Sequence, residues 1–448
     1  MTLDVNPAID KGQCLRTGVW YGDSLLDLDF PPNWNVANHW PETPPPLTGT
    51  VIAPILERPI GQPPIRELCR GAKSPVIVID DVNRPTPVAS VLPLVLGQFR
   101  DAGIVAQDVT ILLSTGMHAA PQFDSVLSKV GPEAGSKCKI VIHNSRQLVS
   151  RVGKTSFGTP VYVNREVTKS DFVMGIGGIY PNHTAGYGGG SKLALGVLGF
   201  RSILALHYFH RSLGRSSSAE RNTFRDDLDE IARMLKFRTM ISIHSNADRQ
   251  PVRVTCGDYL NYFKDEVAFA RRTFTVPAPV NADLVISNAY PCDLSLTFAF
   301  VKGAAPLQLC SPKASRVLIA SCPEGVGGHG LFPNINVPRF HNLRNYCRFG
   351  LIRPISFGKK ASSALLHRAL RSIRPAKQNP RPTWKHSVWL YVPTSSFLSL
   401  PHCLPGVNVT NSWADVLRGV EAEQGTTREL DVALYPCVPL LSITHPGR

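Results

Sequence analysis

The sequence contains no apolar run that approaches the roughly 20 residues needed for a membrane-spanning helix. Its first residues, Met1 to Pro7, carry neither the basic nor the apolar part of a secretory signal, so we expect a cytoplasmic protein. The ten cysteines form no Cys-x-x-Cys pair, and no His-x-x-x-His pattern is present to complete a zinc site. Reduced, buried thiols are therefore favoured over a disulfide framework or a structural metal.

Acidic residues are missing from one long stretch of the sequence: no Asp or Glu occurs between Gly325 and Ala414. Residues 339–385 contain twelve Lys or Arg, so much of the net charge of +15 lies in one block. Such a block could bind nucleic acid or attract anionic substrates. A solvated helix face over 361–374 explains it more simply, since no aromatic interleaving and no nucleic-acid-binding motif accompany the charge.

The chain length of 448 residues exceeds the size at which a single core stops growing, so two domains are expected. Short apolar runs alternate with helix-like stretches from residue 74 onward, which predicts an α/β fold with a largely parallel sheet. The predicted strands are 74–80, 108–113, 138–143, 171–179, 284–287, 316–320, 387–391 and 431–435. The predicted helices are 88–102, 123–130, 201–213 and 361–374.

Residues 1–60 predict an irregular lead with one or two short strands. The proline-rich segment 277–283 precedes a new strand and makes a plausible boundary between domains. We therefore predict an N-terminal α/β domain over 1–276, which holds the cofactor and the catalytic residues. A C-terminal α/β domain over 277–448 follows, and its last segment is placed back against the first domain.

A glycine-rich segment, Tyr180 to Lys192, follows one of the predicted strands. Ligands of open α/β sheets bind beyond the carboxyl ends of the strands, and consecutive glycines let backbone N–H groups approach an anion. The order of Ser191 and Lys192 differs from that of the NTPase phosphate loop, so a classical NTPase is disfavoured. The candidate phosphate-binding residues are Gly188, Gly189, Gly190, Ser191 and Lys192.

Other strand ends carry further candidates. Asp81 and Arg84 follow one strand, where the arginine could bind a carboxylate or phosphate, or could form only a local ion pair. His118 follows the next strand and is a candidate general base, although a lone histidine is more often structural. His207 and His210 lie on a predicted helix and could ligate a metal or could simply be exposed. A second glycine-rich loop begins at Glu324.

In this order, the motifs resemble those of the nickel-dependent lactate racemase family, with a match from about residue 50 to about residue 335. The matching segments are Asp81-x-x-Arg84-x-Thr-Pro, Ser114-Thr-Gly-Met-His118, Pro181-Asn-His-Thr-Ala-Gly-Tyr-Gly-Gly-Gly-Ser-Lys192, His207, Val301-Lys302-Gly and Glu324-Gly-x-Gly-x-x-x-x-Phe332.

The resemblance implies two α/β domains with the active site in a cleft between them. It also implies a nickel-pincer nucleotide, a pyridinium-3,5-bisthiocarboxylic acid mononucleotide in which two sulfurs and a ring carbon hold the nickel. Lys192 matches the lysine to which this cofactor is attached, and His207 matches the histidine that supplies the fourth nickel ligand. Asp81 is placed beside the cofactor, while Arg84 and Lys302 match charged residues near cofactor and substrate. Cofactor-making enzymes are implied as partners.

The implied reaction inverts carbon 2 of a 2-hydroxy acid through reversible removal of hydride, with a histidine taking the hydroxyl proton. His118 matches one of two catalytic histidines in the family. The second histidine position is Asn182 here, and His183 follows it; an asparagine cannot act as a base at neutral pH. A position that is often glutamine is Ala299. Both differences concern substrate contacts and favour a larger 2-hydroxy acid, such as a sugar acid, over lactate.

Two other functions fit the same sequence less well. The fold could serve a one-way oxidoreductase or a nucleotide-binding hydrolase that lacks pincer chemistry. A basic nucleic-acid-binding protein centred on 339–385 is the second alternative.

Overall fold

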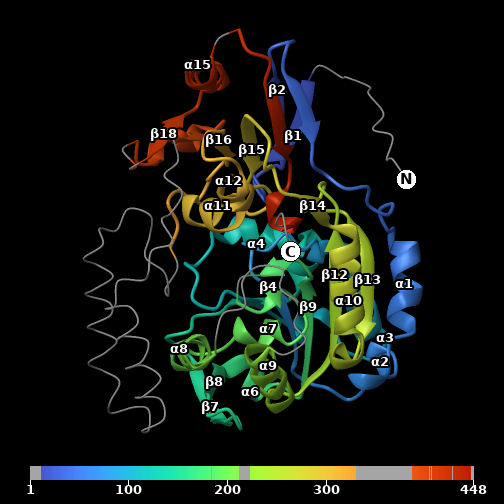
Figure 1. The fold of residues 1–448 in the computed structure, drawn as a ribbon. Helices are drawn as coiled ribbons and strands as arrows, with labels where there is room; N and C mark the ends of the chain where they lie inside the picture. The colour runs from blue at the N-terminus through green and yellow to red at the C-terminus, as the bar shows by residue number, and fades with distance from the viewer. Residues whose placement is uncertain are drawn as a thin grey trace, which may run out of the picture.

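The computed structural model describes residues 12–182, 184–210, 222–328, 386–402, 404, 406–425 and 427–444. Two six-stranded sheets dominate this part of the chain, and each packs against helices (Figure 1). The predicted α/β fold is confirmed. The basic block 339–385 and the predicted helix 361–374 lie outside the described residues.

The first sheet is parallel except at one edge. Its order is β13 (Pro251–Gly257), β12 (Phe237–Ser245), β9 (Phe172–Gly178), β4 (Pro75–Asp80), β5 (Thr110–Ser114) and β6 (Lys139–Ile142). Only the β12–β13 pair is antiparallel. The strands predicted at 74–80, 108–113, 138–143 and 171–179 are confirmed as β4, β5, β6 and β9.

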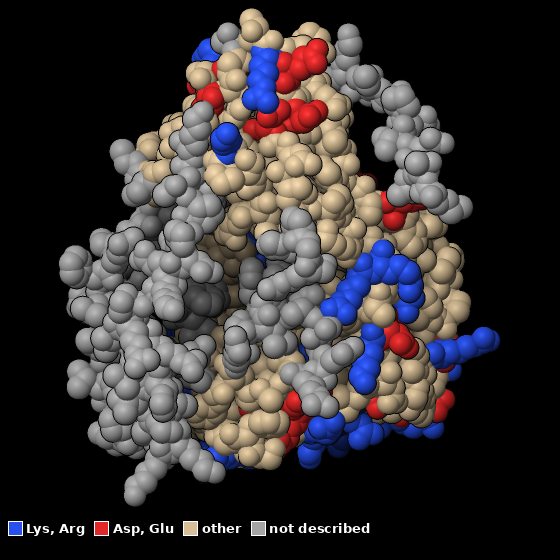
Figure 2. All heavy atoms as spheres, in the orientation of Figure 1, with Lys and Arg blue, Asp and Glu red and all other residues tan. Residues whose placement is uncertain are grey.

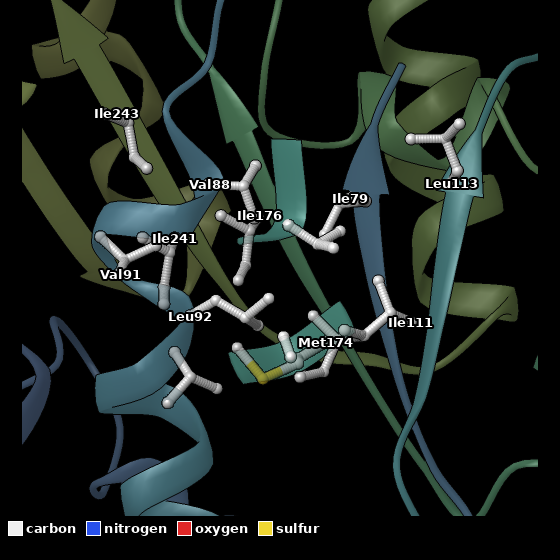
Figure 3. Packing of buried hydrophobic residues seen from close by; sticks show 14 of the residues in the cluster. Ile79, Val88, Val91, Leu92, Ile111, Leu113, Met174, Ile176, Ile241 and Ile243 are labelled. Carbon is white, nitrogen blue, oxygen red and sulfur yellow. The ribbon is translucent and has the colours of Figure 1, made fainter. Parts of the chain in front are cut away.

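Helices cover both faces of this sheet, so its central strands are buried throughout, as their continuous apolar runs predict. Alternate side chains point to opposite faces. Figure 3 shows Ile79, Ile111 and Ile176 on the face that packs against the residues around Val88 and Leu92. Val76, Val78, Leu112 and Val173 lie in the core of the opposite face. Burial of each such side chain contributes about 1.5–3 kcal/mol.

The second sheet is parallel and draws strands from both ends of the chain. Its order is β18 (Val407–Thr410), β17 (Val388–Tyr391), β16 (Ser315–Ile319), β15 (Leu284–Asn288), β19 (Asp431–Tyr435) and β3 (Asn35–Asn38). The strands predicted at 284–287, 316–320, 387–391 and 431–435 are confirmed. Edge strand β3 belongs to the stretch 1–60, which therefore contributes to the sheet formed by the C-terminal half.

Small strand pairs complete the sheets. They are β1 (Gly12–Thr17) with β2 (Ser24–Asp29), β7 (Val149–Lys154) with β8 (Pro160–Asn164), β10 (Pro181–Asn182) with β11 (Gly186–Tyr187), and β14 (Thr275–Pro277) with β20 (Ser442–Thr444). The β14–β20 pair joins the end of the chain to the segment just before residue 277. The division into domains at residues 276 and 277 stays a prediction.

The described helices are α1 (Gly49–Glu57), α2 (Ile65–Leu68), α3 (Leu92–Asp101), α4 (Phe123–Val130), α5 (Pro132–Lys137), α6 (Arg165–Lys169), α7 (Lys192–Leu195), α8 (Phe200–Phe209), α9 (Thr223–Met234), α10 (Tyr259–Thr273), α11 (Leu296–Gly303), α12 (Ala305–Leu309) and α15 (Trp413–Gln424). Helix α1 was not predicted, because the proline-, aspartate- and tryptophan-rich composition of residues 1–60 indicates an irregular segment; Pro54 lies inside this helix. The helix predicted at 123–130 has the bounds of α4. Among the described helices, none is long and apolar enough to cross a membrane.

A buried carboxylate ties the two sheets together. Asp293 is fully buried and accepts hydrogen bonds from the backbone N–H groups of Gly18 and Val19 and from the hydroxyl of Ser321. Burial raises the pKa of Asp293, and these hydrogen bonds oppose that rise. Trp20, two residues after Gly18, donates to the carbonyl of Val82 in the loop after β4. The segment between β1 and β2 thus holds the strand ends of both sheets near one another.

Candidate active site

A cavity of about 770 Å³ lies beyond the carboxyl ends of β4, β5 and β9. The loops after these three strands, the glycine-rich segment and α8 line one side of it. Helices α11 and α12, which pack on the second sheet, line the other side. Figure 2 shows a hollow near the centre of the face drawn. The cavity therefore receives residues from the elements of both sheets.

His118 forms a close pair with Asp81 inside this cavity. The His118 Nδ1 lies 2.5 Å from Asp81 Oδ2, and the ring of Phe298 contacts the imidazole edge-on at 4.7 Å between centroids. Gly116 has a φ of +59°, which lets the chain turn after β5 and bring His118 to Asp81. The Asn83 side chain also donates to Asp81 Oδ2.

The protonation states in this pair follow from burial and charge. Burial lowers the pKa of His118, the Asp81 carboxylate opposes that change, and the charges of Arg84 and Lys192 lower it further. Burial alone would raise the pKa of Asp81, but the interactions with His118 and Arg84 lower it overall. The stable arrangement is a neutral imidazole that donates Nδ1–H to an ionised carboxylate. The basic lone pair then lies on Nε2.

Arg84 and a buried lysine shape the loop between β4 and α3. The Arg84 guanidinium lines the cavity and lies 5.9 Å from the centroid of the Tyr180 ring. Lys129 is fully buried; it forms an ion pair with Asp80 at 2.8 Å and donates to the carbonyl of Arg84 at 3.0 Å. This buried ion pair fixes the loop that carries Asp81 and Arg84. Lys129 has no signal in the sequence, where it looks like an ordinary residue of an amphipathic helix.

The glycine-rich segment presents only part of its length to the cavity. Gly188, Gly189 and Lys192 line the cavity. Gly189 and Gly190 have φ values of +73° and +54°, a conformation that disfavours other residues. Gly190 packs against the Phe263 ring, and the buried Ser191 faces α9. Among the predicted phosphate-binding residues, Gly190 and Ser191 therefore lie behind the three that line the cavity.

Lys192 is set apart by its pKa, which falls to about 7. Burial is the main cause, the charges of Arg84 and Arg225 add to it, and Asp80 opposes it. A large fraction of this amine is therefore neutral at neutral pH. A neutral amine is the nucleophilic form that covalent attachment to a cofactor requires.

His207 of α8 and His210, which directly follows this helix, both line the cavity but differ in their surroundings. His207 lines the cavity, and its Nδ1 lies 2.7 Å from the carbonyl oxygen of Ile203, which places the Nδ1 proton there and the lone pair on Nε2. In His210, Nδ1 bonds the hydroxyl of Thr223 and Nε2 bonds Asp227 at 2.8 Å. Both ring nitrogens of His210 are thus hydrogen-bonded within the protein, and the assignment of His207 as a metal ligand stays a prediction.

Asn182 lines the cavity, but its side chain is committed to its own loop. Its Oδ1 accepts hydrogen bonds from the backbone N–H groups of Thr184 and Ala185, both at 3.0 Å. This is a turn-forming role, which polar side chains of this size commonly take. His183 lies outside the described residues.

Two predicted residues of α11 have different positions. Lys302 is buried and lines the cavity, so it is placed with Arg84 around one site. Ala299 is fully buried and packs in the core of the second sheet. Its methyl group is part of the core and does not line the cavity, so the expectation that this position contacts the substrate is not supported.

The site fits a nucleotide cofactor that brings most of the ligands for its own metal. Among the described residues, no group of three or more His, Cys, Asp or Glu is placed to hold a metal ion. A nickel ion next to His207 would therefore need its remaining donors from the cofactor, as a pincer ligand with two sulfurs and a carbon provides. Gly188 has no space for a side chain, because a Cβ there would lie 3.0 Å from the Tyr180 ring.

Fold and site together define an α/β protein with a charged, histidine-containing ligand site at the ends of its strands. Residues 21–219 match the family model of the lactate racemase N-terminal domain, a range that includes the candidate residues from Asp81 to His210 but not Ala299, Lys302 or Glu324. The lactate racemase of Lactiplantibacillus plantarum is 26% identical over 289 residues, which cover 62% of this chain and 68% of that protein. The lactate racemase of Thermoanaerobacterium thermosaccharolyticum is 27% identical over 291 residues, or 63% and 68%.

Solved structures share the fold. The lactate racemase apoprotein of T. thermosaccharolyticum superposes with a TM-score of 0.65 at 20% identity, covering 96% of this chain and all of that one. A protein of Thermotoga maritima gives a TM-score of 0.55 at 12% identity, covering 90% of this chain and all of that one. The chain is thus related to the lactate racemases in sequence and in fold, which confirms the resemblance predicted from its motifs.

Proposed function

We propose that this protein is a racemase or epimerase that inverts carbon 2 of a small 2-hydroxy acid and uses a nickel-pincer nucleotide as cofactor. The observation that carries the proposal is the His118–Asp81 pair in one cavity with Arg84, Lys192 and His207. The relatives named lactate racemase support the class of reaction.

The base is His118. Its Nδ1–H is held by Asp81, so Nε2 can take the proton of the substrate hydroxyl group. Asp81 keeps the imidazole in the productive tautomer and stabilises the imidazolium that forms when the proton arrives. The lowered pKa of His118 keeps it neutral, and therefore competent as a base, at neutral pH.

Arg84 and Lys302 bind the substrate as an anion. Both line the cavity, and they come from elements that pack on different sheets. A guanidinium can hold a carboxylate through two parallel hydrogen bonds, and a second positive charge adds attraction without fixing one geometry. The Phe298 ring beside His118 contributes an apolar wall that excludes water from the base.

The cofactor, when bound, supplies the group that accepts the hydride of carbon 2 and returns it. In this chain, Gly188, Gly189 and Lys192 would hold the nucleotide part, and Nε2 of His207 would ligate the nickel. Loading requires the cofactor-making enzymes, which we propose as partners.

Nickel content tests the assignment of the ligand. Protein co-expressed with the cofactor-making enzymes should contain nickel, and His207→Ala should lose it. Asp227→Asn is a matched control that disturbs the partner of His210 but not His207. If His207→Ala retained full metal content while Asp227→Asn lost it, His210 would replace His207 as the ligand.

A larger substrate than lactate suits this cavity. Its volume of about 770 Å³ must hold the cofactor as well as the substrate, so the support for a larger acid is Asn182, which lines the cavity where the resemblance places a second histidine. We therefore propose a sugar acid or another extended 2-hydroxy acid. Cofactor-loaded protein incubated with a panel of 2-hydroxy acids, followed by chiral chromatography, should show inversion of an extended acid. Absence of inversion for every acid would contradict the proposed function.

A further inference from the structure

A buried arginine supports the glycine-rich segment from behind. Arg225 of α9 is 5% exposed, and its guanidinium donates to the carbonyls of Gly189 at 2.8 Å and Tyr187 at 2.5 Å. Its Nη1 also lies 3.4 Å from the hydroxyl of Ser191, and its plane lies 4.2 Å from the centroid of the Phe263 ring. One side chain therefore contacts three positions of the cofactor loop.

These contacts set the direction of two peptide groups. In a trans peptide the C=O and N–H groups point in opposite directions, so the carbonyl of Gly189 facing Arg225 turns the N–H of Gly190 away from it. The carbonyl of Tyr187 does the same for the N–H of Gly188, which donates to Tyr180 at 2.8 Å. Without Arg225, the carbonyl of Tyr187 would lose this donor, and the carbonyl of Gly189 would keep only the N–H of Lys192 at 3.2 Å. The loop would then relax by rotating these peptides.

The position of Gly190 reflects the same packing. A Cβ on Gly190 would lie 2.9 Å from the Phe263 ring and 3.6 Å from Nη1 of Arg225. The stacked Arg225–Phe263 pair therefore occupies the space that a side chain would need. This explains why the third glycine of the run is a glycine although it does not line the cavity.

Arg225 also brings a positive charge close to Lys192, because its Nη1 lies 3.4 Å from the hydroxyl of Ser191 and shares the carbonyl of Gly189 with the backbone N–H of Lys192. Burial lowers the pKa of Arg225 to about 10, so it stays charged at neutral pH, and the charge of Asp229 opposes the change. Arg84 from the loop after β4 adds a second positive charge near Lys192, and Asp80 adds the opposing negative one. The charge of Lys192 in turn lowers the pKa of His118. Arg225 is the member of this group that is placed behind the loop, outside the cavity lining.

We propose that Arg225 is a positioning residue of the cofactor loop: it holds the carbonyls of Tyr187 and Gly189 away from the ligand and places a positive charge directly behind Lys192. This inference rests on the proposed function for the identity of the ligand. It concerns atoms that can be probed in the cofactor-free protein, so the two can fail separately.

The pH dependence of Lys192 modification tests the electrostatic part. Cofactor-free wild type and Arg225→Met are labelled with acetic anhydride at a series of pH values, and mass spectrometry follows the peptide that contains Lys192. Loss of the neighbouring charge should raise the apparent pKa of Lys192 by roughly 1 unit, which lowers labelling below that pKa about tenfold. Arg233→Met, an exposed arginine on the same helix, is the matched control and should superpose on the wild type.

Arg225→Lys separates charge from geometry, because a lysine retains the charge but lacks the planar fork that reaches both carbonyls. Its labelling profile should stay near that of the wild type. Its affinity for nicotinamide mononucleotide, a pyridinium mononucleotide measured by calorimetry, should fall several-fold. This variant also serves if Arg225→Met fails to fold by circular dichroism.

The outcomes are distinct. A folded Arg225→Met protein with an unchanged Lys192 profile would overturn the electrostatic role, and unchanged nucleotide affinity in Arg225→Lys would overturn the geometric role. A purely structural arginine would lower the unfolding temperature of both variants without moving either readout. Failure of the proposed reaction would leave both readouts measurable.

Discussion

The loops that follow β5 and β9 flank the same strand, β4, yet they use their polar residues in different ways. On the β5 side, His118 is turned toward Asp81 and is held as a neutral base. On the β9 side, the Oδ1 of Asn182 accepts hydrogen bonds from two backbone N–H groups of its own loop. The partner of a side chain, more than its position at a strand end, decides whether it takes part in chemistry or in turn formation.

The largest effect is expected when the base is removed. His118→Gln keeps a polar side chain of similar size but has no group that titrates near neutral pH. In cofactor-loaded protein it should lower the rate of inversion by about 10²–10⁴-fold while nickel content stays constant. Steady-state kinetics with parallel metal analysis measures both. Wild-type activity in His118→Gln would move the base to the Asn182 side of the cavity.

A smaller loss is expected when the partner of the base is changed. In Asp81→Asn the negative charge that favours the imidazolium is gone, so His118 becomes a weaker base and its tautomer is no longer fixed. The rate should fall by about 10²-fold. The acid limb of the pH–rate profile should move to lower pH, because Asp81 raises the pKa of His118. A rate loss with no shift of that limb would argue against direct contact between the two groups.

The pH profile of the wild type gives the next comparison. His118 acts as a base only in its neutral form, so activity should rise as pH increases through its pKa. Since burial lowers that pKa, the acid limb of kcat/KM should lie below pH 6.5. A limb well above pH 6.5 would mean that the carboxylate outweighs burial at this site.

On the other side of the comparison, Asn182 should matter for stability more than for chemistry. Asn182→Ala leaves two backbone N–H groups without their acceptor and should lower the free energy of unfolding by about 1–2 kcal/mol. Asn182→Asp retains an acceptor oxygen and should lose less. Denaturant unfolding of the cofactor-free protein measures both. Equal losses in the two variants would mean that the turn does not depend on Oδ1.

Much of the sheet could be predicted because its signals are local. Apolar runs of four to six residues bounded by polar turns identified β4, β5 and β15, and α4 was recognised from its periodicity. Strand β3 was not assigned to the second sheet, since its pairing with β19 joins residues almost 400 positions apart.

The residues of the site likewise divide into those with a local signal in the sequence and those without one. Glycines and histidines that follow predicted strands are recognisable in the sequence, so His118, Lys192 and the glycine run could be identified in advance. Lys129 and Arg225 could not, because each acts through contacts with carbonyls far away in the chain. The buried position of Ala299 also has no local signal; it depends on which face of α11 meets the sheet.

The fate of the hydrogen on carbon 2 tests the central claim most directly. Cofactor-loaded protein in deuterated water is given one stereoisomer of an accepted 2-hydroxy acid, and mass spectrometry of the inverted product locates any deuterium. If hydride leaves carbon 2 and returns while His118 handles only the hydroxyl proton, the inverted product should keep its original hydrogen on carbon 2. Deuterium on carbon 2 of every inverted molecule would show that a base removes that hydrogen as a proton, and would contradict the proposed mechanism.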